Sequence, residues 1–311
     1  MRKQLCDGLV ARSARPDMVF LTGDLGFMAL EPLREAMEHR FINAGVAEQN
    51  MVSAAAAMAR EGLDAWVYSI APFCYARPFE QIRNDVAFHK LPVKLIGNGG
   101  GYGYGVMGPT HHAIEDYGIL LTLPNMRAYI PAFDQDVQAV LDRAGDAGVP
   151  AYIRLGRGEI PQNYDVPTYA PWRQLLAGYG KTVIVAGPLV GTYLTELQLL
   201  PEHIRPNLWV VSELPLDRNP LPSELLSQLL SKRGVCVVEE HVSRGGLGSE
   251  LSIFMLRNKI QPGSFHHLYA QAHHYASYGS QNFLQAKSGL DVKSLLAVVT
   301  RNNRYDYSYS Y

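Results

Sequence analysis

Residues 40–60 read RFINAGVAEQNMVSAAAAMAR, and this stretch decides the fold. Arg40 to Ile42 is predicted to form a short strand. Val46 to Arg60 is rich in alanine and contains neither proline nor glycine, so it predicts a helix, which ends at Gly62. A strand that passes through a glycine turn into a helix is the unit from which parallel sheets are built.

The same alternation continues on both sides of this stretch. In the first half we expect further strands at Asp17–Thr22, Ala65–Ile70, Pro92–Ile96, Met126–Ile130 and Ala151–Leu155, and helices at Pro78–His89 and Asp134–Ala144. In the second half we expect strands at Thr182–Ala186, Leu208–Val211 and Gly234–Glu239, and helices at Leu189–Leu200, Pro222–Lys232 and Gly248–Arg257. The pattern predicts an α/β protein with two doubly wound, mostly parallel sheets. The expected domains are residues 1–160 and 181–311, joined by a proline-containing linker at 161–180.

Composition excludes several classes of protein. Of the 311 residues, 47% are apolar and 18% are charged. The charged share lies below the roughly 25% of ordinary soluble domains. This excludes intrinsic disorder and indicates surface that is buried against another chain. The net charge of −1 argues against nucleic acid and anionic membranes as partners. No apolar run approaches the ~20 residues of a membrane span.

The cysteines and the two ends of the chain carry weaker signals. The three cysteines form no CxxC pair, and the first residues do not resemble a secretory signal. We therefore expect a cytoplasmic location. The aromatic stretch from Tyr305 to Tyr311 is expected to be either disordered or a docking end for a partner.

Glu48 is the first candidate for chemistry. In parallel α/β folds, ligands bind at the carboxyl ends of strands, and Glu48 follows the strand and glycine turn described above. A carboxyl one turn into an apolar helix is expected to have a raised pKa, because burial disfavours its charged form. The alternative is an ordinary first-turn glutamate stabilised by the helix dipole.

Two other patterns suggest sites that we reject. The glycine-rich run Gly97–Gly105 lacks the Lys-Ser/Thr of a phosphate-binding P-loop and does not open directly into a helix. His112 and Asp116, and the adjacent pairs His266–His267 and His273–His274, suggest a metal. The spacing of His112 and Asp116 is equally typical of the solvated start of a helix. In the two adjacent histidine pairs, the side chains of neighbouring residues point apart, which does not suit a metal site. We therefore expect no metal ligands in this chain.

Four segments at expected strand ends carry a family resemblance when taken together and in order. They are Phe41–Asn50, Tyr68–Arg77, Gly105–His112 and Arg154–Gly158. In this order they resemble the pyrimidine-binding domain of the transketolase family of thiamine-diphosphate enzymes. Glu239–Ser249 and Gly279–Asp291 resemble the C-terminal domain of that family. The resemblance covers nearly the whole chain and implies these two domains as its fold.

The resemblance assigns the cofactor-binding residues. It implies that Glu48 hydrogen-bonds N1′ of thiamine diphosphate and so promotes loss of the thiazolium C2 proton. Phe73 or Tyr75 would stack on the aminopyrimidine, and the sequence does not decide between them. Asp24 lies in a segment that matches the Asp-Leu turn of the pyrimidine domain, and we assign it to the cofactor.

The resemblance also assigns substrate residues. It implies that His111 donates a hydrogen bond to the reacting oxygen of the substrate and moves protons there. Arg77 and Arg157 are assigned to substrate, with Arg157 on the phosphate of a sugar phosphate. A surface pair with Glu159 is the alternative for Arg157. Val106–Met107 replaces the Glu-Asp that is common in transketolases, so we expect an unusual ketose or an α-keto acid as donor.

What precedes this portion in full-length relatives defines the expected partner. There, another α/β domain binds the diphosphate through a divalent metal, with a Gly-Asp-Gly motif that Gly23–Gly26 resembles only superficially. We expect this chain to be the β-like subunit of a split transketolase that moves a two-carbon ketol unit between sugar phosphates. A diphosphate-binding partner subunit would hold Mg²⁺ in an α₂β₂ assembly. The alternatives are a decarboxylating synthase, a 2-oxoacid dehydrogenase E1 β-type subunit, and a non-catalytic scaffold.

Overall fold

Strands of the first half are apolar because nearly all of them are covered on both faces. The computed structural model describes residues 1–26 and 28–301, and the stretch Tyr305–Tyr311 lies outside the described residues. The first sheet has the strand order β10-β5-β6-β4-β3-β1-β2. Its strands are β1 (Met18–Thr22), β2 (Phe41–Asn43), β3 (Asp64–Ile70), β4 (Lys94–Asn98), β5 (Arg127–Tyr129), β6 (Ala151–Leu155) and β10 (Glu213–Leu214). All neighbours pair in parallel except β10, which is antiparallel to β5.

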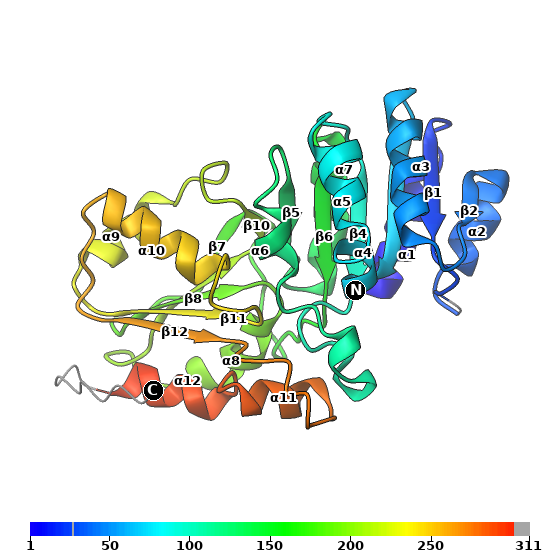
Figure 1. Cartoon of the computed structure of the whole chain (residues 1–311). Helices are drawn as coiled ribbons and strands as arrows, with labels where there is room; N and C mark the ends of the chain where they lie inside the picture. The colour runs from blue at the N-terminus through cyan, green and yellow to red at the C-terminus, as the bar shows by residue number, and fades with distance from the viewer. Residues whose placement is uncertain (27, 302–311) are drawn as a thin grey trace.

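Helices cover both faces of this sheet (Figure 1). On one face, α3 (Glu48–Arg60) packs against β1 and β3, and its buried side is largely small alanines. On the other face, α1 (Arg2–Arg12) and α7 (Val137–Asp146) enclose the core. The remaining helices of this half are α2 (Glu31–Met37), α4 (Ala71–Tyr75), α5 (Phe79–Gln81) and α6 (Asp116–Leu120), with short 3₁₀ turns at Glu38–Arg40, Gly105–Met107, Pro109–His111 and Asp134–Asp136.

The second half repeats this arrangement around a sheet of order β12-β11-β8-β9-β7. Its strands are β7 (Trp172–Leu176), β8 (Thr182–Ala186), β9 (Asn207–Val211), β11 (Val235–Glu239) and β12 (Phe265–Tyr269), and only the β7–β9 pairing is antiparallel. In Figure 1, α10 lies above this sheet and α12 below it. Its helices are α8 (Leu189–Leu197), α9 (Ser223–Leu230), α10 (Leu247–Arg257), α11 (Gln281–Lys287) and α12 (Val292–Thr300).

The predicted fold class, two mostly parallel sheets with helices on their faces, is confirmed, but local assignments differ. The helix expected at Pro78–His89 is one turn of α5 followed by a π-helical segment, Ile82–Ala87. The stretch 161–180, expected as a linker, contains β7, which forms the edge of the second sheet. No described helix is long and apolar enough to span a membrane.

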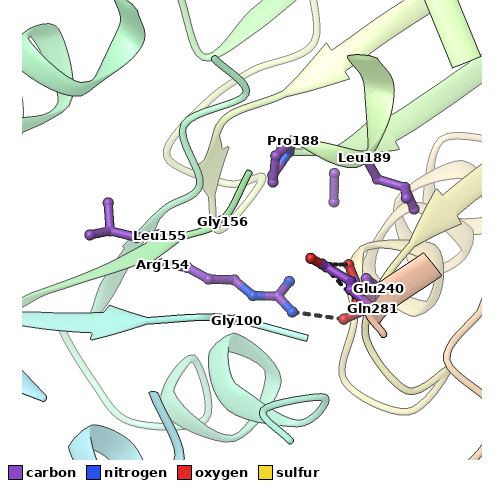
Figure 2. Close-up of a pocket in the computed structure, with 9 residues that line it drawn as sticks. Gly100, Arg154, Leu155, Gly156, Pro188, Leu189, Glu240 and Gln281 are labelled. Atoms are coloured by element: carbon purple, nitrogen blue, oxygen red, sulfur yellow. Dashed lines mark hydrogen bonds between the residues drawn. The ribbon is translucent and has the colours of Figure 1, made fainter. Parts of the chain in front are cut away.

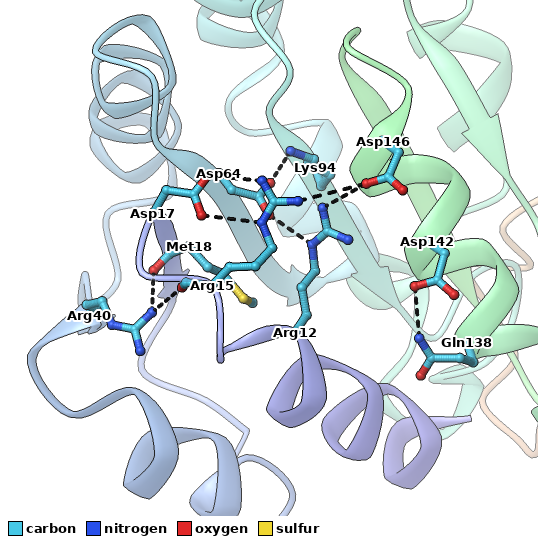
Figure 3. Close-up of polar contacts among 10 residues, drawn as sticks. All are labelled: Arg12, Arg15, Asp17, Met18, Arg40, Asp64, Lys94, Gln138, Asp142 and Asp146. Carbon is cyan, nitrogen blue, oxygen red and sulfur yellow. Dashed lines mark hydrogen bonds and ion pairs between the residues drawn. The ribbon is translucent and has the colours of Figure 1, made fainter.

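Charged residues at the amino ends of the first sheet are paired with one another (Figure 3). Asp64, the first residue of β3, accepts hydrogen bonds from Lys94 and from Arg12, the latter at 2.8 Å. Arg12 also contacts Asp146 at 3.3 Å. Because these carboxylates are already matched by cations, this end of the sheet carries structural ion pairs, and the candidate chemistry lies at the opposite end.

Candidate functional site

The carboxyl ends of the parallel strands bring the predicted site residues to one edge of the first sheet. Asp24 follows β1, Glu48 follows β2, and Phe73 and Arg77 follow β3. The glycine-rich loop that carries His111 follows β4, and Arg157 follows β6. This is the edge at which doubly wound sheets bind ligands, because loops from neighbouring strands converge there.

Glu48 is held at the start of α3 by the turn that precedes it. Gly45 adopts a φ of 69°, in the left-handed region that favours glycine, and its amide donates to the Asn43 side chain at 2.8 Å. Glu48 is the first residue of α3, and not one turn in as expected. It is 6% exposed, so the carboxylate is buried and also lies at the helix N-terminus.

Arg77 contacts both Glu48 and the ring of Phe73. Its Nη1 donates to Glu48 Oε1 at 2.8 Å, and its Cζ lies 3.9 Å from the centre of the Phe73 ring. The Arg77 side chain is 46% exposed and that of Glu48 is 7% exposed. The cation therefore covers a buried carboxylate from the solvent side.

His111 completes this cluster. Its ring meets the Phe73 ring edge-on, with centroids 5.1 Å apart, and Tyr104 lies 6.4 Å away. The Thr110 hydroxyl is 3.0 Å from its Nδ1. Burial, and then repulsion by the Arg77 guanidinium, lower the pKa of His111 below its usual value. The imidazole is therefore neutral at neutral pH, and it can both accept and donate a proton.

The loop carrying His111 is anchored to the second half of the chain. The Tyr102 amide donates to Glu240 Oε1 at 2.7 Å, and Gly101 pairs with Ala113 in an isolated bridge. Gly101 has a φ of 64°, and a Cβ there would lie 2.5 Å from the Glu240 carboxyl carbon. Only glycine fits this approach, because the left-handed backbone and the contact both exclude a side chain.

Buried partners that the sequence analysis did not assign fix this anchor (Figure 2). Arg154 pairs with Asp116 at 3.0 Å and donates to the Glu240 carbonyl at 2.7 Å. Gln281 and Gln285 donate to the Glu240 carboxylate. The cavity among these groups has a volume of only ≈ 10 Å³, too small for a substrate. No local sequence pattern could have found this set, because its members come from both halves.

Three open depressions follow the site edge. One of ≈ 520 Å³ is lined by Val46–Asn50 and Arg77. A second, of ≈ 430 Å³, is lined by residues that include Arg2, Tyr104, Val106–Met107 and Arg157. The third, of ≈ 550 Å³, contains Asp24 and Asn43. The predicted residues are thus spread along one edge without an enclosed pocket.

The remaining predicted residues have different surroundings. Tyr75 is buried, and its hydroxyl donates to Glu115 at 3.2 Å. Phe73 is therefore the aromatic residue that shares the site with Glu48 and His111. Asp24 is exposed and accepts from Asn43 Nδ2 at 3.1 Å, and Arg157 is also exposed.

The histidines considered as metal ligands lie apart from this cluster. His112 is buried and stacks on His273, whose Nε2 lies 2.6 Å from Glu115. Within residues 1–26 and 28–301, no group of three or more His, Cys, Asp or Glu side chains could hold a metal ion.

The Glu48 cluster fits the aminopyrimidine half of thiamine diphosphate. A buried carboxylate matches the polar edge of such a ring, and the face of Phe73 matches its apolar surface. Beside Glu48, the ≈ 520 Å³ depression is open to solvent and large enough for a ring, while Arg77 holds the carboxylate itself.

Comparison with known proteins agrees with this geometry. Residues 10–162 match the family described as transketolase, pyrimidine binding domain. The chain is 30% identical to a subunit of the apulose-4-phosphate transketolase of Phocaeicola vulgatus, over 80% of this chain and 81% of that protein. It is 32% identical to 1-deoxy-D-xylulose-5-phosphate synthase 2 of Geobacter sulfurreducens, over 82% of this chain and 41% of the synthase.

A solved structure extends the likeness to the whole chain. The structure described as a split gene transketolase, inactive beta4 tetramer, superposes with a TM-score of 0.81 and 27% identity, covering 96% of both chains. Fold and family match thus define an α/β protein with a transketolase-type pyrimidine-binding domain. The chain belongs to the transketolase family, and it corresponds to the subunit that carries the pyrimidine-binding and C-terminal domains in a split enzyme.

Proposed function

We propose that this chain is the β-type subunit of a thiamine-diphosphate-dependent transketolase that moves a two-carbon ketol unit between sugar phosphates. The observation that carries the proposal is the meeting of Glu48, Phe73 and His111 at the carboxyl ends of parallel strands. A relative of similar extent, named as one subunit of a transketolase, supports the split organisation. The division into a pyrimidine-binding and a C-terminal domain, with β7 of the stretch 161–180 counted in the second domain, and the cytoplasmic location belong to the same proposal.

Each residue of the cluster has a role in this proposal. When bound, thiamine diphosphate supplies a nucleophilic carbon. Glu48 shares a proton with the pyrimidine N1′, and the face of Phe73 holds the ring in place. His111 hydrogen-bonds the reacting oxygen of the substrate, and its lowered pKa leaves the imidazole neutral and able to take a proton there. Asp24, in the neighbouring depression, is assigned to the cofactor and not to substrate.

The substrate is proposed from the ≈ 430 Å³ depression beside His111. Arg157 lines it and offers a planar set of donors for a phosphate. The exposed side chains of Val106 and Met107 line the same space and offer no carboxylate to accept a hydrogen bond from a hydroxyl. We therefore favour a phosphorylated ketose with an unusual hydroxyl pattern, in keeping with the apulose-4-phosphate in the names of two relatives.

The assembly follows from the open shape of the site. The described residues hold the aminopyrimidine end, and a diphosphate-binding partner subunit would hold the diphosphate through Mg²⁺. Two pyrimidine-binding subunits would meet across a two-fold axis in an α₂β₂ enzyme. The relative of known structure is described as an inactive beta4 tetramer, and we propose that this chain is likewise inactive alone.

Reconstitution tests the proposal. The chain and a diphosphate-binding subunit are mixed and assayed with ketose phosphates and with pyruvate, and thiamine diphosphate binding is measured by calorimetry with and without a chelator. We expect turnover of a ketose phosphate, together with binding that requires both subunits and Mg²⁺. Turnover of pyruvate alone would instead identify a decarboxylating or 2-oxoacid dehydrogenase type. Tight, chelator-insensitive binding to the lone chain would contradict the split enzyme.

Glu48→Gln separates a catalytic subunit from a scaffold. The change is nearly isosteric, and the amide oxygen can still accept from Arg77, so the fold is expected to persist. The amide cannot exchange a proton with N1′, so exchange of the thiazolium C2 proton should fall by at least about 10²-fold. Glu61→Gln, the same change at an exposed glutamate just after α3, is the control. Wild-type exchange in the reconstituted Glu48→Gln enzyme would show that Glu48 has no such role.

A further inference from the structure

Arg77 occupies the two groups on which the cofactor ring depends. Its guanidinium donates to Glu48 at 2.8 Å and lies on the face of Phe73 at 3.9 Å. These are the carboxylate and the aromatic face that fit the aminopyrimidine. Since Glu48 Oε1 and the ring of Phe73 are both engaged, an entering ring meets an occupied site.

The chemistry of the two occupants is alike. A guanidinium is planar, has N–H donors at its edge and stacks on aromatic faces. An aminopyrimidine bound to a carboxylate is also planar, presents N–H donors at its edge and offers a face for stacking. One carboxylate oxygen and one ring face cannot serve both groups in the same place, so Arg77 and the ring compete.

The burial of Glu48 explains what this contact does in the empty subunit. Glu48 is 6% exposed, and a buried carboxylate without a partner is strongly destabilising. The Arg77 side chain is 46% exposed, so it can turn into solvent at little cost once another group covers the carboxylate. The depression beside it, ≈ 520 Å³ in volume and lined also by Val46 and Gln49, provides the space.

We propose that Arg77 is an internal placeholder, which neutralises Glu48 and covers Phe73 in the empty subunit and is displaced when the aminopyrimidine binds. This inference rests on the proposed function, and it reassigns Arg77 from substrate binding to control of cofactor binding. Cofactor binding must replace an ion pair, so the aminopyrimidine end alone binds weakly. Contacts of the diphosphate with the partner subunit then add binding free energy, so that the aminopyrimidine displaces Arg77. Cofactor binding therefore depends on assembly of the two subunits.

Substitution of Arg77 tests the competition through binding and not through turnover. In Arg77→Met the donors and the charge are lost while an unbranched stem is kept. Thiamine, which lacks the diphosphate, is titrated by calorimetry into the lone chain and into the reconstituted complex. We expect its affinity to rise roughly tenfold in the complex, the size of one hydrogen bond to a charged group. Arg83→Met, at an exposed arginine in the following helical segment, should leave the affinity unchanged.

A second variant and a second readout make the test specific. In the Glu48→Gln background the carboxylate charge is gone, so Arg77→Met should change thiamine affinity much less. His111 reports the displacement independently, because the Arg77 charge helps to lower its pKa. NMR titration should show that the pKa of His111 rises in Arg77→Met without any ligand. The pKa should also rise in the wild-type complex when the uncharged dimethyl-aminopyrimidine fragment of thiamine binds, because this fragment lacks the positive thiazolium. Tyr104 faces the same ring in both proteins.

The outcomes separate this inference from the proposed function. Equal or weaker thiamine binding by Arg77→Met, in a complex that binds thiamine diphosphate and is active, would overturn the placeholder and leave the transketolase intact. An unchanged pKa of His111 when the uncharged aminopyrimidine fragment binds to the wild-type complex would also overturn it, since Arg77 would not have moved. A complex that binds no thiamine diphosphate at all would overturn the proposed function, and the placeholder with it.

Discussion

His111 is positioned by residues from its own loop and from the segment after β3. The Phe73 ring meets the His111 ring edge-on, and the Thr110 hydroxyl forms a hydrogen bond with His111 Nδ1. No hydrogen bond to Nε2 occurs among the described residues, so this nitrogen is available for a substrate oxygen. We expect His111→Ala to keep cofactor binding and to lower kcat/KM for the ketose donor by roughly 10²-fold or more.

Two measurements check this expectation in the reconstituted enzyme: calorimetry for the cofactor and initial rates for each donor. Thr110→Ala is the matched control, because it removes the hydrogen bond to Nδ1 and leaves the imidazole in place. Its effect should be much smaller. Unchanged rates with every donor in His111→Ala would make this histidine a structural residue.

His112, the next residue, is buried in the interior and affects stability. Burial, and then the nearby His273 and His274, lower the pKa of His112 to about 4. Glu115 lies in the same group and acts in the opposite direction. Between pH 6.5 and about 4 the unfolded chain is protonated at this position while the folded chain is not, so stability falls as the pH falls through this window.

We expect His112→Phe to reduce this pH dependence. The aromatic ring retains the contact with Tyr102 and the stacking on His273. Wild-type protein should lose up to about 1.4 kcal/mol of unfolding free energy per pH unit at this residue, and the variant should not. Urea unfolding at several pH values measures the slope. His89→Gln, at an exposed histidine, is the control, and equal slopes in the two variants would contradict the assignment.

The sequence was sufficient to predict that Glu48 and His111 lie at the carboxyl ends of strands, because each follows a predicted strand and belongs to a family motif. It was not sufficient to choose between Phe73 and Tyr75, since that choice depends on how the short helix α4 turns. The contact between Arg77 and Glu48 joins residues 29 positions apart. Side-chain conformation decides such a contact, and no sequence spacing reports it.

Among the elements, the glycine-rich loop shows how one half of the chain shapes the site of the other. We expect Gly101→Ala to be more destabilising than Gly148→Ala, although the two glycines have nearly the same φ, 64° and 63°. Each change forces an alanine into the left-handed region, at about 1–2 kcal/mol. Only at Gly101 would the new Cβ also meet Glu240, while Gly148 has nothing within 4 Å.

The difference between these two variants isolates the contact with Glu240. Overpacking of this kind costs about 1–3 kcal/mol beyond the backbone strain. Urea unfolding gives both losses, and turnover of the reconstituted enzyme should fall only in Gly101→Ala, because its loop carries His111. Equal losses in the two proteins would show that the loop does not rest on Glu240.

Elements with a strong apolar signature were predicted from sequence, and those defined by tertiary pairing were not. β1, β3, β6, β8 and β11 are nearly or fully buried, and their composition shows it. β12 is half-exposed and contains two histidines, so nothing local marks it as a strand. β10 has only two residues and exists because β5 offers an unpaired edge.

At the scale of the whole molecule, a buried polar network joins the two halves. Arg154 extends from β6 to Asp116 and to the Glu240 carbonyl, and all three residues are buried, with exposed fractions of 5%, 0% and 6%. We expect Arg154→Met to lower the unfolding free energy by about 3–5 kcal/mol, since Asp116 would remain as a buried unpaired charge.

An exposed ion pair provides the comparison. Lys3 pairs with Asp7 at 2.6 Å with both side chains well exposed, and Lys3→Met should cost at most about 1 kcal/mol. Urea unfolding of the two variants measures both effects. Similar small losses would mean that Asp116 finds another partner and that the junction does not depend on Arg154.

β10 links the two halves of the chain through the first sheet. Glu213 and Leu214 come from the second half of the chain, yet they complete the first sheet by pairing with Tyr129 and Ala128. If the second half were replaced by that of another protein, the edge of β5 would be left unpaired unless the replacement also supplied a strand that pairs with it. The two halves are therefore structurally interdependent, and placing them on separate chains would expose the backbone hydrogen-bonding groups at the edge of β5 to solvent.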